Sequence, residues 1–199
     1  MESAEHLSRF GRSRSGWSFA FLLIVILAGA PCVHAQQAFQ LNGARVAPLQ
    51  QSLSKILVFV FARTDCPISN RYAPLIQELS AKYAQKAVFT LVFPDKTESA
   101  EAIRTYLQEF GYKIEALRDV DLELAKKTGV KVTPEVAVFN AQRELVYHGR
   151  IDNLYPSLGK SRHAATTHEL ADAIDAAVRG VAPAKASAPA VGCFIADVQ

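Results

Sequence analysis

The segment from residue 56 to residue 69 reads Ile-Leu-Val-Phe-Val-Phe-Ala-Arg-Thr-Asp-Cys-Pro-Ile-Ser, and it decides the fold of this chain. Its first seven residues, Ile56 to Ala62, form an apolar run that predicts a strand buried on both faces. Cys66 follows, and Pro67 suits the first position of a helix that we expect from about Ser69 to Tyr83. Cys66 therefore stands at a junction between a buried strand and a helix.

This position favours a reactive sulfur at Cys66. Backbone N–H groups and the dipole at a helix N-terminus stabilise negative charge, and the thiolate is the nucleophilic form of cysteine. A free cysteine can instead be a small buried apolar residue. However, the polar residues Arg63, Asp65 and Asn70 flank it in the sequence. We therefore predict that Cys66 is a nucleophile.

An apolar segment near the N-terminus indicates export. Residues 19–30 carry no charge, and they lie between Arg9, Arg12 and Arg14 on one side and Val33-His34-Ala35 on the other. A bilayer crossing needs about 20 residues. A basic leader, a short apolar core and a small-x-small end are typical of a secretory signal peptide, here residues 1–35. The alternative is an uncleaved inner-membrane anchor at residues 19–30.

Export would place the mature chain in the periplasm or outside the cell, with no stable membrane span after cleavage. Cys32 lies within the leader, so the mature chain keeps two thiols, Cys66 and Cys193. An even pair in an oxidising compartment favours a disulfide. The pattern leaves open whether that bond is structural, catalytic or intermolecular. The net charge of +3 is too small to predict a nucleic-acid partner.

The rest of the chain alternates strands and helices and then ends in a hairpin and a helix. Such an order predicts an α/β domain at residues 36–180, with a mixed central sheet flanked by helices. Residues 181–199 are rich in Ala and Pro and predict an extended, flexible tail that carries Cys193. We expect strands at 87–93, 114–117, 135–140 and 144–147. We also expect three helices: one that Thr97 caps, one at 122–128, and one that begins with a capping box of Thr166 and Glu169.

Several motifs resemble the thioredoxin-like superfamily. Cys66-Pro67-Ile68-Ser69 resembles the thioredoxin Cys-x-x-Cys motif with serine in the second position, and Pro74 stands where thioredoxins carry a helix-bending proline. Val130–Pro134 resembles the segment whose proline is cis in that fold. The resemblance covers roughly residues 50–180. It implies that Thr133 and Pro134 present backbone to the reactive sulfur and to a substrate chain. An ordinary turn is the other interpretation of Thr133-Pro134.

The chain is more closely similar to exported redoxin-domain proteins of the AhpC/TSA-like group. The stretches that carry this similarity are residues 64–74, 133–135, 147–153 and 192–195. The resemblance implies an antioxidant or thiol–disulfide oxidoreductase, or a thiol peroxidase, without a cofactor. Its partners would be a disulfide-bearing protein or a peroxide, together with a thiol reductant.

The departures from these families concern the chemistry. Ser69 cannot form a disulfide, although its hydroxyl could donate a hydrogen bond to a Cys66 thiolate. Phe59 occupies the position where thioredoxins bury an acid. A peroxiredoxin would show Pro-x-x-x-Thr-x-x-Cys, whereas here Thr64 lies two positions before Cys66 and no proline precedes it at the right distance. Thr64 remains a candidate for tuning the sulfur, but a peroxide pocket is in doubt.

Cys193 is the candidate resolving cysteine. Thiol–disulfide exchange needs a second sulfur to release a mixed disulfide, and an extended link over residues 181–192 can span on the order of 35 Å. Alternatively, Cys193 is a tail thiol or bonds to another protein. Arg150, at a predicted strand end, could steady a thiolate or could simply pair with Asp152.

Two other functions remain open. A copper-handling protein could use Cys66, Cys193 and one histidine, but residue 62, where a Cys-x-x-x-Cys pair would need its first cysteine, is alanine. We therefore assign no metal site. A non-catalytic binding module on the same fold is the second alternative.

Overall fold

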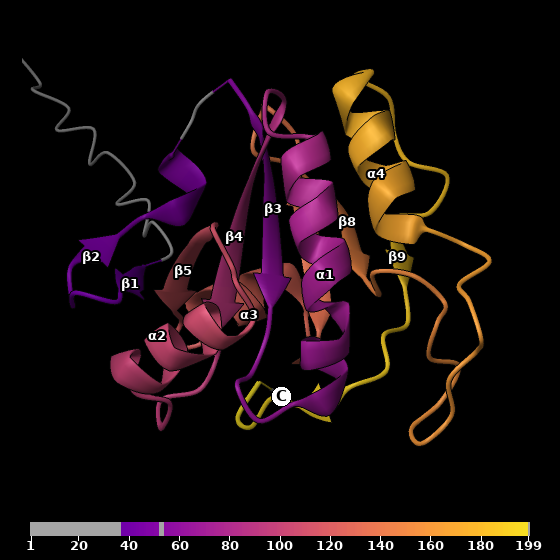
Figure 1. Cartoon of the computed structure of the whole chain (residues 1–199). Coiled ribbons are helices and arrows are strands. Elements are labelled where there is room, and N and C mark those ends of the chain that lie inside the picture. The colour runs from indigo at the N-terminus through magenta and orange to yellow at the C-terminus, as the bar shows by residue number, and fades with distance from the viewer. Residues whose placement is uncertain (1–36, 52–53, 199) are drawn as a thin grey trace, which may run out of the picture. The chain divides into compact units, whose positions relative to one another are not determined.

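The computed structural model describes residues 37–51 and 54–198 (Figure 1). The predicted signal peptide at residues 1–35, with its alternative as an anchor at 19–30, lies outside the described residues. Within the described ranges, every helix is too short or too polar to cross a bilayer.

The described residues form one large mixed sheet and one small sheet. The large sheet has eight strands in the order β2-β1-β5-β4-β3-β7-β8-β9. These strands are β1 (Ala38–Gln40), β2 (Arg45–Val46), β3 (Ile56–Phe61), β4 (Ala87–Phe93), β5 (Glu115–Arg118), β7 (Glu135–Phe139), β8 (Leu145–Gly149) and β9 (Ser187–Ala188). The central strand β3 runs parallel to β4 and antiparallel to β7. The small sheet pairs β6 (Val132–Thr133) with β10 (Cys193–Phe194).

Helices cover both faces of the large sheet, as the sequence predicts. They are α1 (Pro67–Lys82), α2 (Ala100–Glu109), α3 (Glu123–Thr128) and α4 (Glu169–Val178), with a short 3-10 helix η1 (Pro48–Gln50) before β3. In Figure 1, α1 and α4 lie in front of the same side of the sheet. Buried residues of α1, α2 and α4 belong to one apolar cluster, and those of α3 belong to another.

The strand β3 separates these two clusters. Successive side chains of a strand point to opposite faces. Val58 and Val60 pack in the cluster with α1, α2 and α4, whereas Phe59 and Phe61 pack with α3. All six residues of β3 are buried. The continuous apolar run at this position is therefore the run expected of a strand covered on both sides.

Two predicted helix starts are displaced in the structure. Ser99, not Thr97, caps α2, because its side chain accepts a hydrogen bond of 3.0 Å from the Ala102 amide. Similarly, α4 begins at Glu169 after His168 and lacks the predicted capping box. The Thr166 amide instead donates to the side chain of Asn153 at 2.8 Å. The Thr97 hydroxyl instead donates to the nearby Asp95 side chain, and the Thr166 hydroxyl accepts a hydrogen bond from the Asn153 side chain.

The C-terminal segment differs from the flexible tail that its composition predicts. It is extended, but it pairs with the domain at two places: β9 lies parallel to β8, and β10 lies antiparallel to β6. At the first place, Gly149 has φ +141° and lies so close to Ala188 that a Cβ would be 2.1 Å from the Ala188 carbonyl oxygen. Figure 1 shows the segment in yellow, passing from α4 through β9 toward the beginning of α1.

Candidate active site

Cys66 lies at the strand-to-helix junction that the sequence predicts. It is the N-cap residue of α1, directly before Pro67 at the first helical position. Its carbonyl oxygen accepts a hydrogen bond of 3.1 Å from the Asn70 amide. The side chain is fully buried, with 0% of its surface exposed. Cys66 therefore combines a helix N-terminus, which favours negative charge, with burial, which opposes it.

The second sulfur at this site comes from the C-terminal segment. The Sγ atoms of Cys193 and Cys66 lie 2.9 Å apart, although 127 positions separate the two residues. Both cysteines are free thiols in the structure. Since a disulfide bond is about 2.05 Å long, a small movement would bring the two sulfurs to bonding distance. The structure thus brings together the two thiols that sequence reasoning paired.

The strand β6 holds the C-terminal segment against Cys66. In the antiparallel pairing, Cys193 lies opposite Thr133 and Phe194 lies opposite Val132. The Ile195 amide extends the pairing with a hydrogen bond of 3.0 Å to the Lys131 carbonyl oxygen. The peptide bond between Thr133 and Pro134 is cis. The carbonyl oxygen of Thr133 accepts a hydrogen bond of 3.1 Å from the Cys66 thiol.

The two thiols differ in acid strength. Burial opposes ionisation of Cys66. However, the hydrogen bond from the Cys193 thiol and the polar backbone and hydroxyl groups of Ser69 outweigh burial and hold the pKa of Cys66 below its ordinary value. Burial and the hydrogen bond to Cys66 raise the pKa of Cys193 to about 11. Cys66 is therefore the more acidic thiol of the pair, and the Cys193 thiol donates a hydrogen bond to it.

Ser69 lies beside the Cys66 sulfur in the first turn of α1. Its side chain is buried, and its hydroxyl oxygen has no hydrogen-bond partner of ordinary geometry among the described residues. The hydroxyl nevertheless contributes to lowering the Cys66 pKa. The role of Ser69 in supporting a thiolate stays a prediction.

Thr64, a candidate for tuning the Cys66 sulfur, is hydrogen-bonded to Glu98. Its amide and its hydroxyl both donate to Oε1 of Glu98, each at 2.7 Å. Glu98 is 9% exposed, and desolvation raises its pKa despite the two hydrogen bonds. The other carboxylate oxygen, Oε2, is buried without a partner among the described residues. Thr64 thus fixes the loop before Cys66 through a buried acid.

Sequence reasoning missed Glu98 and a second acid, Glu135. The carboxylate of Glu135 accepts hydrogen bonds from the amides of Lys131 and Val132, at 2.8 and 3.2 Å, and so supports the backbone that carries β6. Glu135 belongs to the Thr-Pro-Glu stretch of the sequence, but its local pattern does not reveal which amides it would reach. Glu98 has no local signal, because an acid beside a helix start usually lies on the surface.

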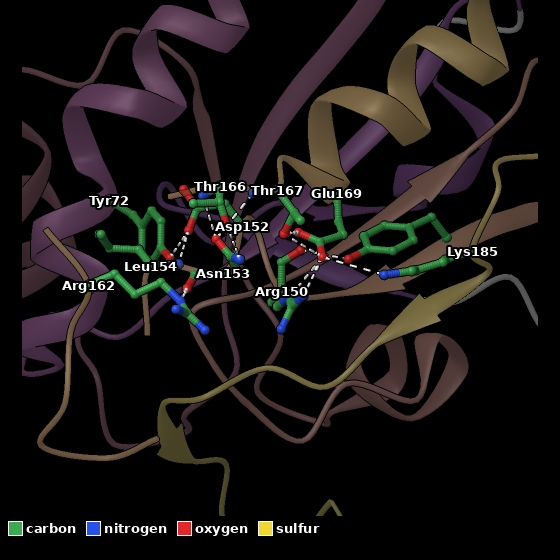
Figure 2. A network of polar contacts seen from close by, with 11 residues as sticks. Tyr72, Arg150, Asp152, Asn153, Leu154, Arg162, Thr166, Thr167, Glu169 and Lys185 are labelled. Carbon is green, nitrogen blue, oxygen red and sulfur yellow. Dashed lines mark hydrogen bonds and ion pairs between the residues drawn. The ribbon is translucent and has the colours of Figure 1, made fainter. Parts of the chain in front are cut away.

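Arg150 does not contact Cys66 in the described part of the chain, contrary to the role considered for it. Figure 2 shows it in a polar network between β8 and α4. Its Nε donates to Oε1 of Glu169 at 3.1 Å, and its terminal nitrogen contacts the same oxygen. The Thr167 hydroxyl donates to that carboxylate at 2.9 Å. Hydrogen bonds from Arg150 and Thr167 keep the pKa of Glu169 low despite burial.

The predicted alternative for Arg150, an ion pair with Asp152, is also absent from the described contacts. Asp152 is buried and accepts a hydrogen bond from the Tyr72 hydroxyl and another, of 2.8 Å, from the Leu154 amide. Burial and this carboxylate raise the pKa of Tyr72. The network therefore joins α1 to the loop after β8 and has a structural role (Figure 2).

The copper-handling alternative lacks a ligand cluster in the part of the chain that the structure describes. There, no group of three or more His, Cys, Asp or Glu side chains is arranged to hold a metal ion. Within residues 37–51 and 54–198, the two sulfurs thus have no third ligand of these types arranged beside them.

Comparison with known proteins identifies the fold. A family model described as thioredoxin-like matches residues 54–145. A hypothetical protein from Sinorhizobium meliloti 1021 has a similar structure, with a TM-score of 0.67 and 24% identity over 80% of this chain and 88% of its own. An uncharacterised conserved protein from Geobacillus kaustophilus gives 0.65 and 22%, over 81% of this chain and 89% of its own.

A third similar structure is a secreted disulfide oxidoreductase from Mycobacterium tuberculosis that is homologous to E. coli DsbE. It has a TM-score of 0.50 and 18% identity, over 74% of this chain and 96% of its own. No curated protein matches the sequence significantly. At these identities the structural similarity establishes a shared fold, and the site's own geometry must support any function.

Proposed function

We propose that this chain, whose fold is thioredoxin-like, is an exported thiol–disulfide oxidoreductase in which Cys66 attacks and Cys193 resolves. One observation carries the proposal: the two Sγ atoms lie 2.9 Å apart, although Cys193 is on a segment far along the chain. Their unequal pKa values assign the two roles.

In the first step, the Cys66 thiolate attacks one sulfur of a substrate disulfide. A mixed disulfide forms on Cys66, and the other substrate sulfur leaves as a thiolate. The helix N-terminus of α1, the backbone of Ser69 and its hydroxyl all stabilise the attacking anion. Ser69 cannot resolve the mixed disulfide, so the reaction needs a sulfur from outside the Cys-x-x-Ser motif.

In the second step, Cys193 gives its proton to solvent and attacks Cys66 Sγ, and the remaining substrate sulfur leaves as a thiolate; solvent protonates both substrate thiolates. The Cys66 anion contributes to the high pKa of Cys193. Once Cys66 is in a mixed disulfide it carries no charge, so the pKa of Cys193 falls at the moment when its thiolate is required. The net reaction oxidises the two cysteines to a disulfide and reduces the substrate disulfide to two thiols.

Two features favour a disulfide over a peroxide as the substrate. The Thr64 hydroxyl is bound to Glu98, and the Arg150 guanidinium is bound to Glu169, so neither is directed at a peroxide beside Cys66.

Export is supported by the signal-peptide pattern of residues 1–35 and by the secreted disulfide oxidoreductase from M. tuberculosis with the same fold.

The test follows both steps separately. The reduced protein is mixed with an oxidised peptide disulfide and, in parallel, with hydrogen peroxide, and the products are mapped by mass spectrometry. We expect the parent protein to form a Cys66–Cys193 disulfide and to release two substrate thiols. Cys193→Ser should accumulate a mixed disulfide on Cys66, and Cys66→Ser should not react.

Two intact thiols after exposure to both oxidants would refute the proposal. A Cys66–Cys193 bond formed faster with peroxide than with the disulfide would contradict the substrate assignment and support a thiol peroxidase. A bond between two protein molecules, seen as a covalent dimer, would contradict resolution within one chain.

A further inference from the structure

The C-terminal segment lies in close backbone contact with the edge of β6, which a linker that merely carries Cys193 would not need. Gly192 lies against Thr133 at a distance that leaves no room for a side chain, because a Cβ would be 2.1 Å from the Thr133 carbonyl oxygen and 2.6 Å from its carbonyl carbon. Real Cβ atoms do not approach backbone so closely. Any strand that pairs with β6 in this position must therefore have glycine before its cysteine.

A second contact lies on the other side of Cys193. Ile195 is 6% exposed and packs in the cluster with α3, while its amide donates to Lys131. Phe194 between them is 75% exposed. Strand addition derives its affinity from main-chain hydrogen bonds and its specificity from pockets for alternate side chains. The edge of β6 therefore selects the pattern Gly-Cys-x-Ile.

Access to Cys66 depends on this segment. Cys66 is fully buried while β10 is paired, and Cys193 occupies the position beside its sulfur. The edge of β6 is two residues long and is filled by one strand. A substrate chain that reaches Cys66 along this edge can do so only after the C-terminal segment has left it.

The thioredoxin resemblance implies that a substrate chain pairs with the backbone at Thr133. We propose that residues 192–195 are a tethered competitor for that edge of β6, which an extended, cysteine-bearing segment of a partner protein must displace. This inference rests on the proposed oxidoreductase function. When the Cys193 thiolate attacks Cys66 Sγ, the bond from Cys66 to the substrate breaks and the Cys66–Cys193 bond forms. At the same time, β10 takes the substrate's place on β6. Resolution and product release are thus one event.

Gly192→Ala tests the competition directly, since the added Cβ collides with backbone that cannot yield easily. Ala196→Ser is the matched control, because Ala196 lies on the same segment and is exposed. Each reduced variant is treated with iodoacetamide over a range of pH, and modification of Cys66 is followed by mass mapping. The plateau rate at high pH reports access to the sulfur rather than its pKa.

We expect the plateau rate for Cys66 to rise by about tenfold or more in Gly192→Ala, as for a site released from a local closed state. Ala196→Ser should match the parent. Equal plateau rates in Gly192→Ala and the parent would overturn the proposal, because they would show that the segment does not control access.

Peptides test the binding site itself. The probe is a fluorescent peptide of residues 189–198 with serine in place of the cysteine, measured by anisotropy. It should bind Gly192→Ala protein more tightly than the parent, whose own segment competes. A probe with alanine in place of its glycine should lose at least about tenfold in affinity. Equal binding of both probes, or equal affinity for both proteins, would contradict the proposal.

These outcomes are separable from those of the proposed function. If the parent forms the Cys66–Cys193 disulfide but Gly192→Ala changes neither access nor peptide binding, the oxidoreductase stands and the competitor is refuted. If the disulfide does not form in the parent, the oxidoreductase itself fails, whatever the peptide measurements show.

Discussion

At the scale of single residues, the site contains two thiols in contact whose acid strengths differ. Cys66 is fully buried and has a lowered pKa, whereas Cys193 is half-buried and has a pKa of about 11. In thiol–disulfide exchange, the sulfur of lower pKa is the better leaving group, and the exposed sulfur is the one that can be attacked. Both considerations direct an incoming reductant to Cys193 once the disulfide has formed.

We therefore predict that a small thiol reduces the oxidised protein by attacking Cys193. Oxidised protein is mixed briefly with glutathione and quenched with acid, and the adduct is located by peptide mapping. Glutathione should be found on Cys193, with Cys66 released as a free thiol. If most of the glutathione adduct is found on Cys66 at the shortest reaction times, the prediction is wrong.

Glu98 gives a second prediction at this scale, concerning pH. Desolvation raises its pKa in the folded protein, so folding is favoured by the protonated acid. This contribution is fully present below the unfolded pKa of about 4.3 and is lost as the pH rises through the folded value. Glu98→Gln cannot ionise, yet it keeps an acceptor for Thr64. It should therefore raise Tm at pH 7 more than at pH 4.

Thermal unfolding at both pH values measures this effect. A gain of about 1 kcal/mol would correspond to roughly 2–4 °C. Glu109→Gln, an exposed acid on α2, is the control and should shift Tm little. A lower Tm for Glu98→Gln at pH 7 would show that the ionised carboxylate is favourable where it is.

At the scale of elements, β9 positions the segment that carries Cys193. Its pairing with β8 depends on Gly149, where a Cβ would lie 2.1 Å from the Ala188 carbonyl oxygen. Without this pairing, the segment that must close on Cys66 would extend back to the end of α4. The strand thus shortens the loop that brings the second sulfur to the first, and it lowers the entropic cost of closing it.

We predict that Gly149→Ala slows formation of the Cys66–Cys193 bond. Lengthening the free segment from about residues 188–193 to about residues 180–193 lowers its closure probability by roughly fourfold. Gly159→Ala is a matched control: its φ is also positive, at +72°, but its Cβ would meet nothing within 4 Å. Rates are measured after rapid mixing with oxidised glutathione. Equal slowing in both variants would point to a general loss of stability.

At the scale of the whole molecule, the two thiols connect the first long strand of the sheet to the end of the chain. A bond between residues 127 positions apart restricts the unfolded chain strongly. The chain-entropy model gives roughly 5 kcal/mol for a loop of this length, as an upper value. The redox state of the site is therefore coupled to the stability of the whole domain.

Oxidation should accordingly raise the Tm of the parent protein by an amount on the order of 10 °C. Scanning calorimetry of the oxidised and reduced forms measures the difference. Cys193→Ser, treated identically, should show none. An unchanged Tm in the parent, with the disulfide verified by mass spectrometry, would contradict the prediction. It would mean that the bond removes little conformational entropy from the unfolded chain.

Much of the framework could be read from local patterns in the sequence. The apolar run at 56–62 predicts a doubly buried strand, Cys66 with Pro67 predicts a helix start, and the hairpin of β7 and β8 follows from two short apolar runs. These features depend on neighbouring residues only. The same reasoning paired Cys66 with Cys193 by counting thiols, but it treated residues 181–192 as a flexible tether.

Only the tertiary structure decided how that pairing is achieved. The positions of Glu98 beside Thr64 and of Arg150 on Glu169 depend on contacts between residues that are not close in sequence. The docking of Gly192 and Ile195 on β6 depends on the shape of an edge formed by another part of the chain. Periodicity and propensity report what a segment does with its neighbours. Periodicity and propensity carry no information on which distant backbone a segment will pair with. Here the pairing of the C-terminal segment with β6 places the Cys193 sulfur beside that of Cys66.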